Sequence, residues 1–311
     1  MGIPVIDFSK IDGKERASAL AEIDRCCEEW GFFQLINHGI SEELLDRVKK
    51  VATECYKLER EAGFKNSKPV QLLNELLENK SDEKIENVDW EDVFLLSDEN
   101  DDEWPSKTPG FKETMKEYRT ELKKLGNKVM ELLDENLGLP KGYIKNAFEG
   151  GVENAAFFGT KVCHYPPCPY PEKVNALRAH TDAGGVVLLF QDDEVKGLQM
   201  LKDGVWTDVQ PLKNAIVINT GDQIEVLSNG KYKSNLHRIV PQTNGQRRSI
   251  ASFYNPSLKA TIQPALLGNK VENKVTEVAK YPKFVFEDYM SVYLEQKFQP
   301  KEPRFQAVAA V

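Results

Sequence analysis

The sequence predicts a mainly β protein with flanking helices, of the α+β class, in which an antiparallel jelly roll follows a helical N-terminal region. Apolar residues recur at helical spacing in the first half of the chain. Short runs rich in β-branched and aromatic residues, separated by tight-turn dipeptides, replace this pattern in the second half. Many short strands with few helices between them favour an antiparallel jelly roll over a parallel sheet.

Three apolar stripes predict helices in the first half. They are Leu20, Ile23, Cys27 and Trp30; Leu45, Val48, Ala52 and Cys55; and Met115, Tyr118, Leu122, Leu125, Val129, Leu132 and Leu133. The last helix should stop at Gly138 and Pro140. Between the helices, the acidic run 97–106 contains Pro105, which predicts a solvated loop.

Six runs predict strands in the second half: GTKVCHY, VVLLF, LQML, AIVIN, HRIV and SIASFY. Three dipeptides predict hairpins between strands, because Gly, Asn and Asp tolerate the positive φ of tight turns. They are Asp203-Gly204, Asn229-Gly230 and Asn244-Gly245.

Composition narrows the class of protein. A chain of 311 residues with 41% hydrophobic content can fill a sizeable core. The net charge of −8 argues against a nucleic-acid surface and fits an enzyme acting on a small molecule. No long apolar window and no signal-peptide pattern is present, so we expect a soluble, cytoplasmic protein without an obligate protein partner. Five cysteines do not suggest a disulfide framework, and Cys163 and Cys168 lack the further ligands of a zinc site.

The stretch LRAHTD, residues 177–182, raises the question of a metal site. In a strand, residues i and i+2 project from one face, so His180 and Asp182 can point at one place. His237 could supply a third ligand, and two histidines with one carboxylate leave the open positions that non-haem Fe(II) enzymes use. The alternative is a polar turn with no ligand. His38 and His164 are predicted to be structural.

Arg247 and Ser249 share a strand face in QRRSIASFY. If Asn244-Gly245 is a two-residue turn, the guanidinium ends on the order of 10 Å from the metal, too far to ligate it. A guanidinium matches a carboxylate bidentately, which suits a clamp for a small anion. The alternative is a surface arginine at a hairpin end.

These residues resemble the iron- and 2-oxoglutarate-dependent dioxygenase superfamily, and IPVIDFS with WGFFQLINHGI resembles the N-terminal region of its plant members. Within it, the chain resembles the 1-aminocyclopropane-1-carboxylate oxidases, which form ethylene. The similar stretches are NVDWEDVF, ENLGLPKGYIKNAF, FFGTKV, LRAHTDAGGVVLLFQDD, GDQIEVLSNGKYKS, ASFYNP and KFQPKEPRF. The resemblance implies a double-stranded β-helix core, cupin-like, at 156–256. Before it lie a mainly helical region with a first strand at 1–105 and a long helix with a linker at 106–155, and a helical tail at 257–311 closes on the site.

The resemblance also implies an activity. His180, Asp182 and His237 would hold Fe(II), and the enzyme would convert 1-aminocyclopropane-1-carboxylate and O₂ to ethylene, CO₂ and cyanide, the last step of plant ethylene biosynthesis. Ascorbate would be the reductant and bicarbonate or CO₂ the activator. Catalytic roles would fall to Lys161, Arg178, Arg247 and Ser249. Substrate or cofactor would be bound by Thr160, Tyr165, Gln191, Asn219, Phe253 and the tail residues Lys297, Lys301 and Arg304.

Other interpretations stay open at this point. Arg178 could make a structural salt bridge, Phe253 could be ordinary core, and the basic tail could be a solvated charge run. A 2-oxoglutarate-dependent hydroxylase or desaturase of a plant metabolite would carry the same clamp, although Lys161 and the KEPRF tail speak against it. A metal-binding jelly roll without catalysis, serving as a ligand sensor, is the alternative from another class.

Overall fold

The computed structural model describes residues 2–151, 154–265 and 278–309. Two β-sheets form its core. The larger sheet contains, in spatial order, β1 (Val5–Asp7), β2 (Phe32–Ile36), β9 (Ile216–Thr220), β6 (Val186–Gln191), β11 (Arg247–Asn255), β4 (Phe157–Tyr165) and β3 (Asp92–Leu96). The smaller sheet contains β5 (Leu177–His180), β10 (His237–Ile239), β7 (Leu198–Lys202) and β8 (Val205–Asp208). The short strands β12 (Thr261–Ile262) and β13 (Phe284–Val285) form a separate pair.

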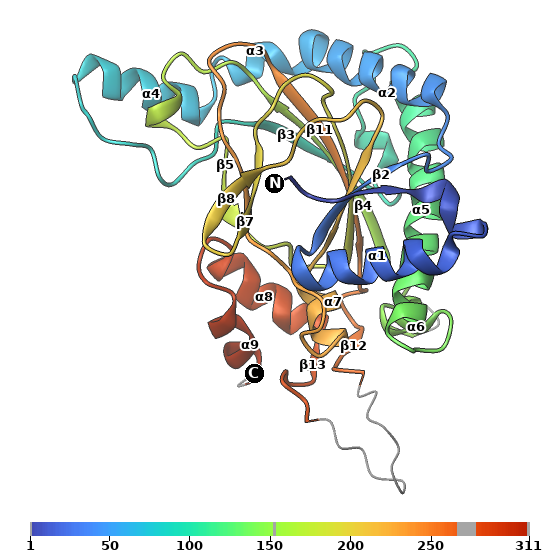
Figure 1. Cartoon of the computed structure of the whole chain (residues 1–311). Helices are drawn as coiled ribbons and strands as arrows, with labels where there is room; N and C mark the ends of the chain where they lie inside the picture. The colour runs from blue at the N-terminus through green and yellow to red at the C-terminus, as the bar shows by residue number, and fades with distance from the viewer. Residues whose placement is uncertain (1, 152–153, 266–277, 310–311) are drawn as a thin grey trace, which may run out of the picture.

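The helices surround this core. They are α1 (Arg16–Glu29), α2 (Glu42–Cys55), α3 (Glu61–Phe64), α4 (Lys68–Glu78), α5 (Phe111–Asn136), α6 (Tyr143–Ala147), α7 (Asp222–Leu227), α8 (Phe286–Gln296) and α9 (Glu302–Val308). Figure 1 shows α1, α2 and α5 on the outer side of the larger sheet, with α8 and α9, in red, near the end of the smaller sheet. The mixture of sheets and flanking helices confirms the predicted α+β class.

The three helical stripes of the sequence lie in α1, α2 and α5, as predicted. Ser41 caps α2, because its side chain accepts a hydrogen bond from the amide of Leu44. Gly138, just beyond the end of α5, has a φ of 67°, a conformation that disfavours residues with a Cβ. Buried side chains of these helices pack against one face of the larger sheet. That packing leaves the opposite face of the sheet for the interior of the jelly roll.

Side chains alternate along β4, so one strand serves both faces of the sheet. Cys163 and Tyr165 belong to an apolar cluster between the two sheets, together with Phe32 of β2 and Met200 of β7. Val162, the intervening residue, packs into the cluster beneath the helices. Only every second residue of β4 can therefore point into the space between the two sheets.

The hairpin predictions were right at one of the three dipeptides. Asp203-Gly204 joins β7 to β8 in a hairpin, with φ values of 50° and 79°. Asn229-Gly230 also has positive φ values, but it follows α7 and joins no pair of neighbouring strands. Asn244-Gly245 lies between β10 and β11, which belong to different sheets. A turn dipeptide shows that the chain reverses there, and the sheet partners of the flanking strands depend on packing elsewhere.

The six predicted strands are present as β4, β6, β7, β9, β10 and β11. Strands β1, β2 and β3 come from the first 105 residues and pair directly into the larger sheet. The division of the chain into four segments stays a prediction. All five cysteines are free and buried. Among the residues described, none of the helices combines the length and hydropathy that a membrane crossing requires.

Candidate metal centre

His180, Asp182 and His237 meet between the two sheets. Each offers a ligand atom, and these atoms all lie within 4.8 Å of one another. His180 is the last residue of β5 and lies opposite His237, the first residue of β10. Asp182 lies beyond the end of β5, so the expectation that it shares a strand face with His180 is wrong. The loop after β5 turns its carboxylate back to the histidines, at 3.7 Å from Nε2 of His180 and 3.6 Å from Nε2 of His237.

Backbone carbonyls determine which nitrogen of each histidine faces this point. Nδ1 of His180 donates to the carbonyl of Arg178 at 2.9 Å, and Nδ1 of His237 donates to that of Asn235 at 3.2 Å. With Nδ1 protonated, each neutral ring presents the lone pair of Nε2 to the centre. Burial and the adjacent His237 lower the pKa of His180 well below its ordinary value, which favours this neutral form.

The carboxylate of Asp182 is also held from behind. Nδ2 of Asn219, on β9, donates to its Oδ2 at 2.7 Å. The backbone amide of Asp222, at the start of α7, donates to the carbonyl of Asp182 at 2.8 Å. The metal-facing groups are therefore fixed by strands and a helix start rather than by a free loop.

The three side chains fit a divalent metal. Two neutral imidazole nitrogens and one carboxylate form the donor set that non-haem Fe(II) prefers when exchangeable positions are left open. Their common side faces a cavity of about 500 Å³. Ten of the residues expected at the site line this cavity: Lys161, Tyr165, His180, Asp182, Asn219, His237, Arg247, Ser249, Phe253 and Lys297.

Arg247 is buried at the wall of this cavity, with 1% of its surface exposed. Its guanidinium donates to Oγ of Ser249 at 3.3 Å and to Oε1 of Gln191 at 3.0 Å. Its Nε has no partner, and no ion pair with a carboxylate forms in the described ranges 2–151, 154–265 and 278–309. Burial lowers the pKa of Arg247, although a guanidinium stays charged in proteins. A buried cation without a counter-ion in the cavity wall is a site for an anion.

Two lysines, Lys161 and Lys297, line the same cavity. Lys161, on β4, forms an ion pair with Glu91 at 3.4 Å. Lys297 follows α8, and burial together with the charge of Lys161 lowers its pKa. The cavity therefore carries an excess of positive charge near the Asp182 carboxylate.

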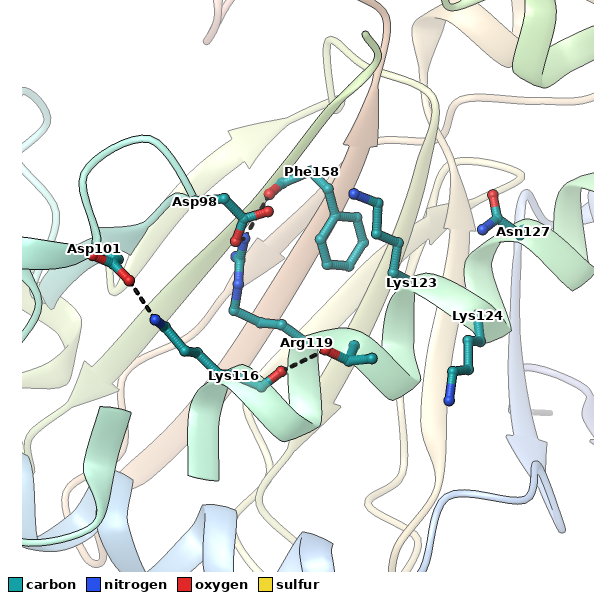
Figure 2. A pocket seen from close by; sticks show the side chains of 9 residues that line it. Asp98, Asp101, Lys116, Arg119, Lys123, Lys124, Asn127 and Phe158 are labelled. Atoms are coloured by element: carbon teal, nitrogen blue, oxygen red, sulfur yellow. Dashed lines mark hydrogen bonds and ion pairs between the residues drawn. The ribbon is translucent and has the colours of Figure 1, made fainter. Parts of the chain in front are cut away.

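Five residues expected at the site do not line the cavity. One of them, Gln191, still affects the cavity wall, because it accepts a hydrogen bond from Arg247. Thr160 lies on the opposite face of β4, where hydrogen bonds join it to Arg119 at 2.7 Å and Ser252 at 2.9 Å. The expectation that Thr160 lines the pocket is wrong, because adjacent strand residues point to opposite faces. Figure 2 shows the separate pocket on that side, where the Arg119 side chain lies beside Asp98 and the Phe158 carbonyl.

The other three are cationic residues with partners outside the cavity. Arg178 forms a salt bridge with Asp89 at 2.9 Å and stacks on the ring of Phe298, 3.7 Å from its centroid. Arg304 is fully buried and Lys301 is partly buried, and both side chains contact α7 rather than the metal ligands. The expectation that these three side chains contact substrate or cofactor has no support in this arrangement.

Several residues around the centre gave no signal in the sequence patterns. The buried carboxylates Asp222 and Glu225 lie in α7, and the hydroxyl groups of Tyr289 and Tyr293 reach Asp222 and the carbonyl of Thr181. Two acidic residues three positions apart, as in GDQIEVL, ordinarily indicate the exposed face of a helix. Their burial was therefore beyond what periodicity could show.

Comparisons with known proteins agree with this site. Residues 158–256 match the family model of the 2OG-Fe(II) oxygenase superfamily, and residues 3–115 match one described as non-haem dioxygenase in morphine synthesis N-terminal. The chain is 67% identical to 1-aminocyclopropane-1-carboxylate oxidase 5 of Arabidopsis thaliana, with 100% of both chains covered. It is 65% identical, at the same coverage, to 1-aminocyclopropane-1-carboxylate oxidase of Musa acuminata. The crystal structure of JOX2 in complex with 2OG, Fe and JA superposes with a TM-score of 0.80 at 31% identity, covering 99% of this chain and 89% of that one.

Proposed function

The chain belongs to the 1-aminocyclopropane-1-carboxylate oxidases of the 2OG-Fe(II) oxygenase superfamily, and we propose that its metal centre oxidises 1-aminocyclopropane-1-carboxylate to ethylene. The balanced reaction takes the amino acid, O₂ and ascorbate to ethylene, CO₂, hydrogen cyanide, dehydroascorbate and two molecules of water. Ascorbate supplies the two electrons and two protons that complete the reduction of O₂.

One observation carries this proposal. The His180, Asp182 and His237 donors share a cavity with the buried cation Arg247. A small amino acid has both an amino and a carboxylate group to place on a metal and beside a cation. The cavity thus offers complementary groups to a substrate of this size and charge.

His180, Asp182 and His237 would hold Fe(II), which would supply open positions for the substrate and O₂. The protein residues provide orientation and charge. Asn219 holds the carboxylate of Asp182, and the carbonyls of Arg178 and Asn235 hold the two imidazoles. The guanidinium of Arg247, steadied by Gln191 and Ser249, binds an anionic oxygen of the substrate or of bicarbonate.

Lys161 and Lys297 add positive charge to the same cavity. Two ammonium groups raise the local concentration of anions, and both ascorbate and bicarbonate are anionic at neutral pH. Bicarbonate as the activator stays a prediction, as do the cytoplasmic location and the lack of an obligate protein partner.

The direct test is ethylene formation. Purified protein with Fe(II), ascorbate, bicarbonate and O₂ should release ethylene from 1-aminocyclopropane-1-carboxylate, measured by headspace gas chromatography, without added 2-oxoglutarate. The Asp182→Ala protein is the control, because it keeps the fold elements and loses one of three ligands.

A 2-oxoglutarate-dependent hydroxylase is the second candidate, favoured by the 2OG bound in the related JOX2 structure and by the Arg247-Ser249 pair here. Under that function the protein would convert 2-oxoglutarate to succinate with a plant acid present and release no ethylene. The same incubations, analysed for succinate, distinguish the two functions.

A further inference from the structure

Lys301 and Arg304, near the C-terminus, contact α7 and do not line the cavity. Arg304 has no exposed surface. Its Nη1 donates to Oγ1 of Thr181 at 2.9 Å and to Oδ2 of Asp222 at 3.1 Å. Its Nη2 donates to the carbonyls of Lys297 and Gln299 at 3.2 and 2.9 Å. One guanidinium therefore joins the tail to the residue between two metal ligands.

Lys301 makes a parallel connection to the strand that carries the third ligand. Its ammonium donates to Oε2 of Glu225 and to the carbonyl of Ser234, both at 2.6 Å. The amide of Ser234 donates to the same Glu225 oxygen at 2.6 Å. Ser234 lies three residues before His237, at the entry to β10. The segment that leads into His237 is thus held by a side chain of α7 and one of the tail.

Helix α7 connects these contacts to the ligands. Asp222 accepts from Oγ1 of Thr181 at 3.2 Å, and its own amide donates to the carbonyl of Asp182 at 2.8 Å. Tyr289 of α8 donates to the Asp222 carboxylate at 2.6 Å, and Tyr293 donates to the carbonyl of Thr181 at 2.9 Å. The segment 180–182, which carries two of the metal ligands at the end of β5 and in the loop after it, is held by α7 and α8 together.

Ion pairs explain why the buried carboxylates of α7 need Lys301 and Arg304. Asp222 and Glu225 are one helical turn apart and buried, and a buried carboxylate is strongly unfavourable without a cationic or hydrogen-bonding partner. Arg304 and Lys301 supply the two cations. Because neither residue lines the cavity, their effect on the site passes through α7 and the ligand segments.

We propose that Arg304 and Lys301 are positioning residues, which hold His180, Asp182 and His237 in their metal-binding geometry through the buried carboxylates of α7. The inference rests on the metal centre of the proposed function and does not depend on which substrate the enzyme oxidises. Positioning groups behind metal ligands typically contribute about 10- to 100-fold to metal affinity.

The test compares two buried arginines. Arg304→Lys keeps the charge but cannot reach four acceptors at once. Arg119→Lys is the matched control, because Arg119 also donates to four acceptors and is 3% exposed, on the helix side of β4. Fe(II) affinity is measured by anaerobic titration, Co(II) ligand-field absorption reports the geometry, and thermal unfolding reports stability.

Metal affinity of Arg304→Lys should fall by about 10- to 100-fold with a changed Co(II) spectrum, and Arg119→Lys should lose stability without either change. Unaltered affinity in Arg304→Lys, or an equal loss in both variants, overturns the proposal. A raised bicarbonate requirement with unchanged metal affinity also overturns it, in favour of direct anion binding by Arg304. The metal affinity, the Co(II) spectrum and the thermal unfolding can be measured even if no ethylene forms, so they separate this inference from the proposed reaction.

A second pair of variants, with smaller changes, provides a test if Arg304→Lys does not fold. Tyr293→Phe removes only the hydroxyl that donates to the carbonyl of Thr181, and Tyr254→Phe removes one that donates to Asn127 of α5. Loss of one hydrogen bond behind the ligands should weaken Fe(II) binding by about two- to tenfold in Tyr293→Phe alone. Equal affinities in the two variants contradict the proposal.

Discussion

Replacing Arg247 by methionine separates an anion-binding role from a structural one. The arginine is almost fully buried, has no carboxylate partner in the described part of the chain, and leaves its Nε unpaired. Methionine preserves the length and flexibility of the side chain while removing the charge and the hydrogen-bonding fork. If the guanidinium binds an anion, it contributes little to the stability of the anion-free protein.

The contacts give the expected magnitudes. The variant loses hydrogen bonds to Ser249 and Gln191, each contributing about 1 kcal/mol. Relief from a buried, uncompensated charge offsets this, since apolar replacement of buried ions is often neutral or stabilising by about 1–4 kcal/mol. The free energy of unfolding should therefore stay within about 2 kcal/mol of the parent. Two charge-assisted hydrogen bonds to an anion, at about 1.5–3 kcal/mol each, correspond to at least a 100-fold loss of affinity.

Two assays check this expectation. Urea unfolding of the metal-free proteins gives the difference in stability, and ethylene production at varied substrate and bicarbonate concentrations gives the loss of affinity. Added anion should raise the unfolding temperature of the parent protein and leave that of Arg247→Met unchanged. The reasoning is refuted if the variant loses more than about 3 kcal/mol of stability while kcat/KM per folded molecule is normal.

Three further changes test the metal ligands, a buried histidine on the helix side of β4, and the loop after β5. Alanine at His180, Asp182 or His237 should abolish ethylene release and Fe(II) binding while the far-ultraviolet circular dichroism spectrum persists; activity in any of the three disproves the ligand set. Burial lowers the pKa of His164 to about 4, so between that pH and about 6.5 only the unfolded chain binds the proton, and stability should rise with pH by up to about 1.4 kcal/mol per unit. His164→Gln should flatten this slope in urea titrations from pH 4.5 to 7, and an unchanged slope would exclude the histidine as its source. At Gly221 an added Cβ would lie 2.4 Å from the carbonyl oxygen of Gly184 and 2.9 Å from that of Asp182. Gly221→Ala should therefore lower both the stability of the protein and its Fe(II) affinity. A metal titration like that of the parent would show that the loop after β5 can shift without disturbing the ligands.

Local patterns determined much of this protein. Helical periodicity located α1, α2 and α5, because an amphipathic helix needs one apolar stripe whatever it packs against. The strand runs located β4, β6, β7, β9, β10 and β11 for a similar reason, since a buried strand needs apolar, β-branched residues along its own length. The metal ligands were recognisable from His180-x-Asp182 and a distant His237, because donor chemistry allows few such sets.

Only the tertiary structure decided which strands pair and which charges are buried. The turn at Asn244-Gly245 could be read from the sequence, but β10 and β11 belong to different sheets, and that choice depends on the packing of the whole interior. Arg304 could be read as a solvated or substrate-binding cation, and its burial became visible only with Asp222, far away in the chain, beside it. A charge is buried where an opposite charge and hydrogen-bonding groups meet it, and those partners are brought together by folding rather than by sequence spacing.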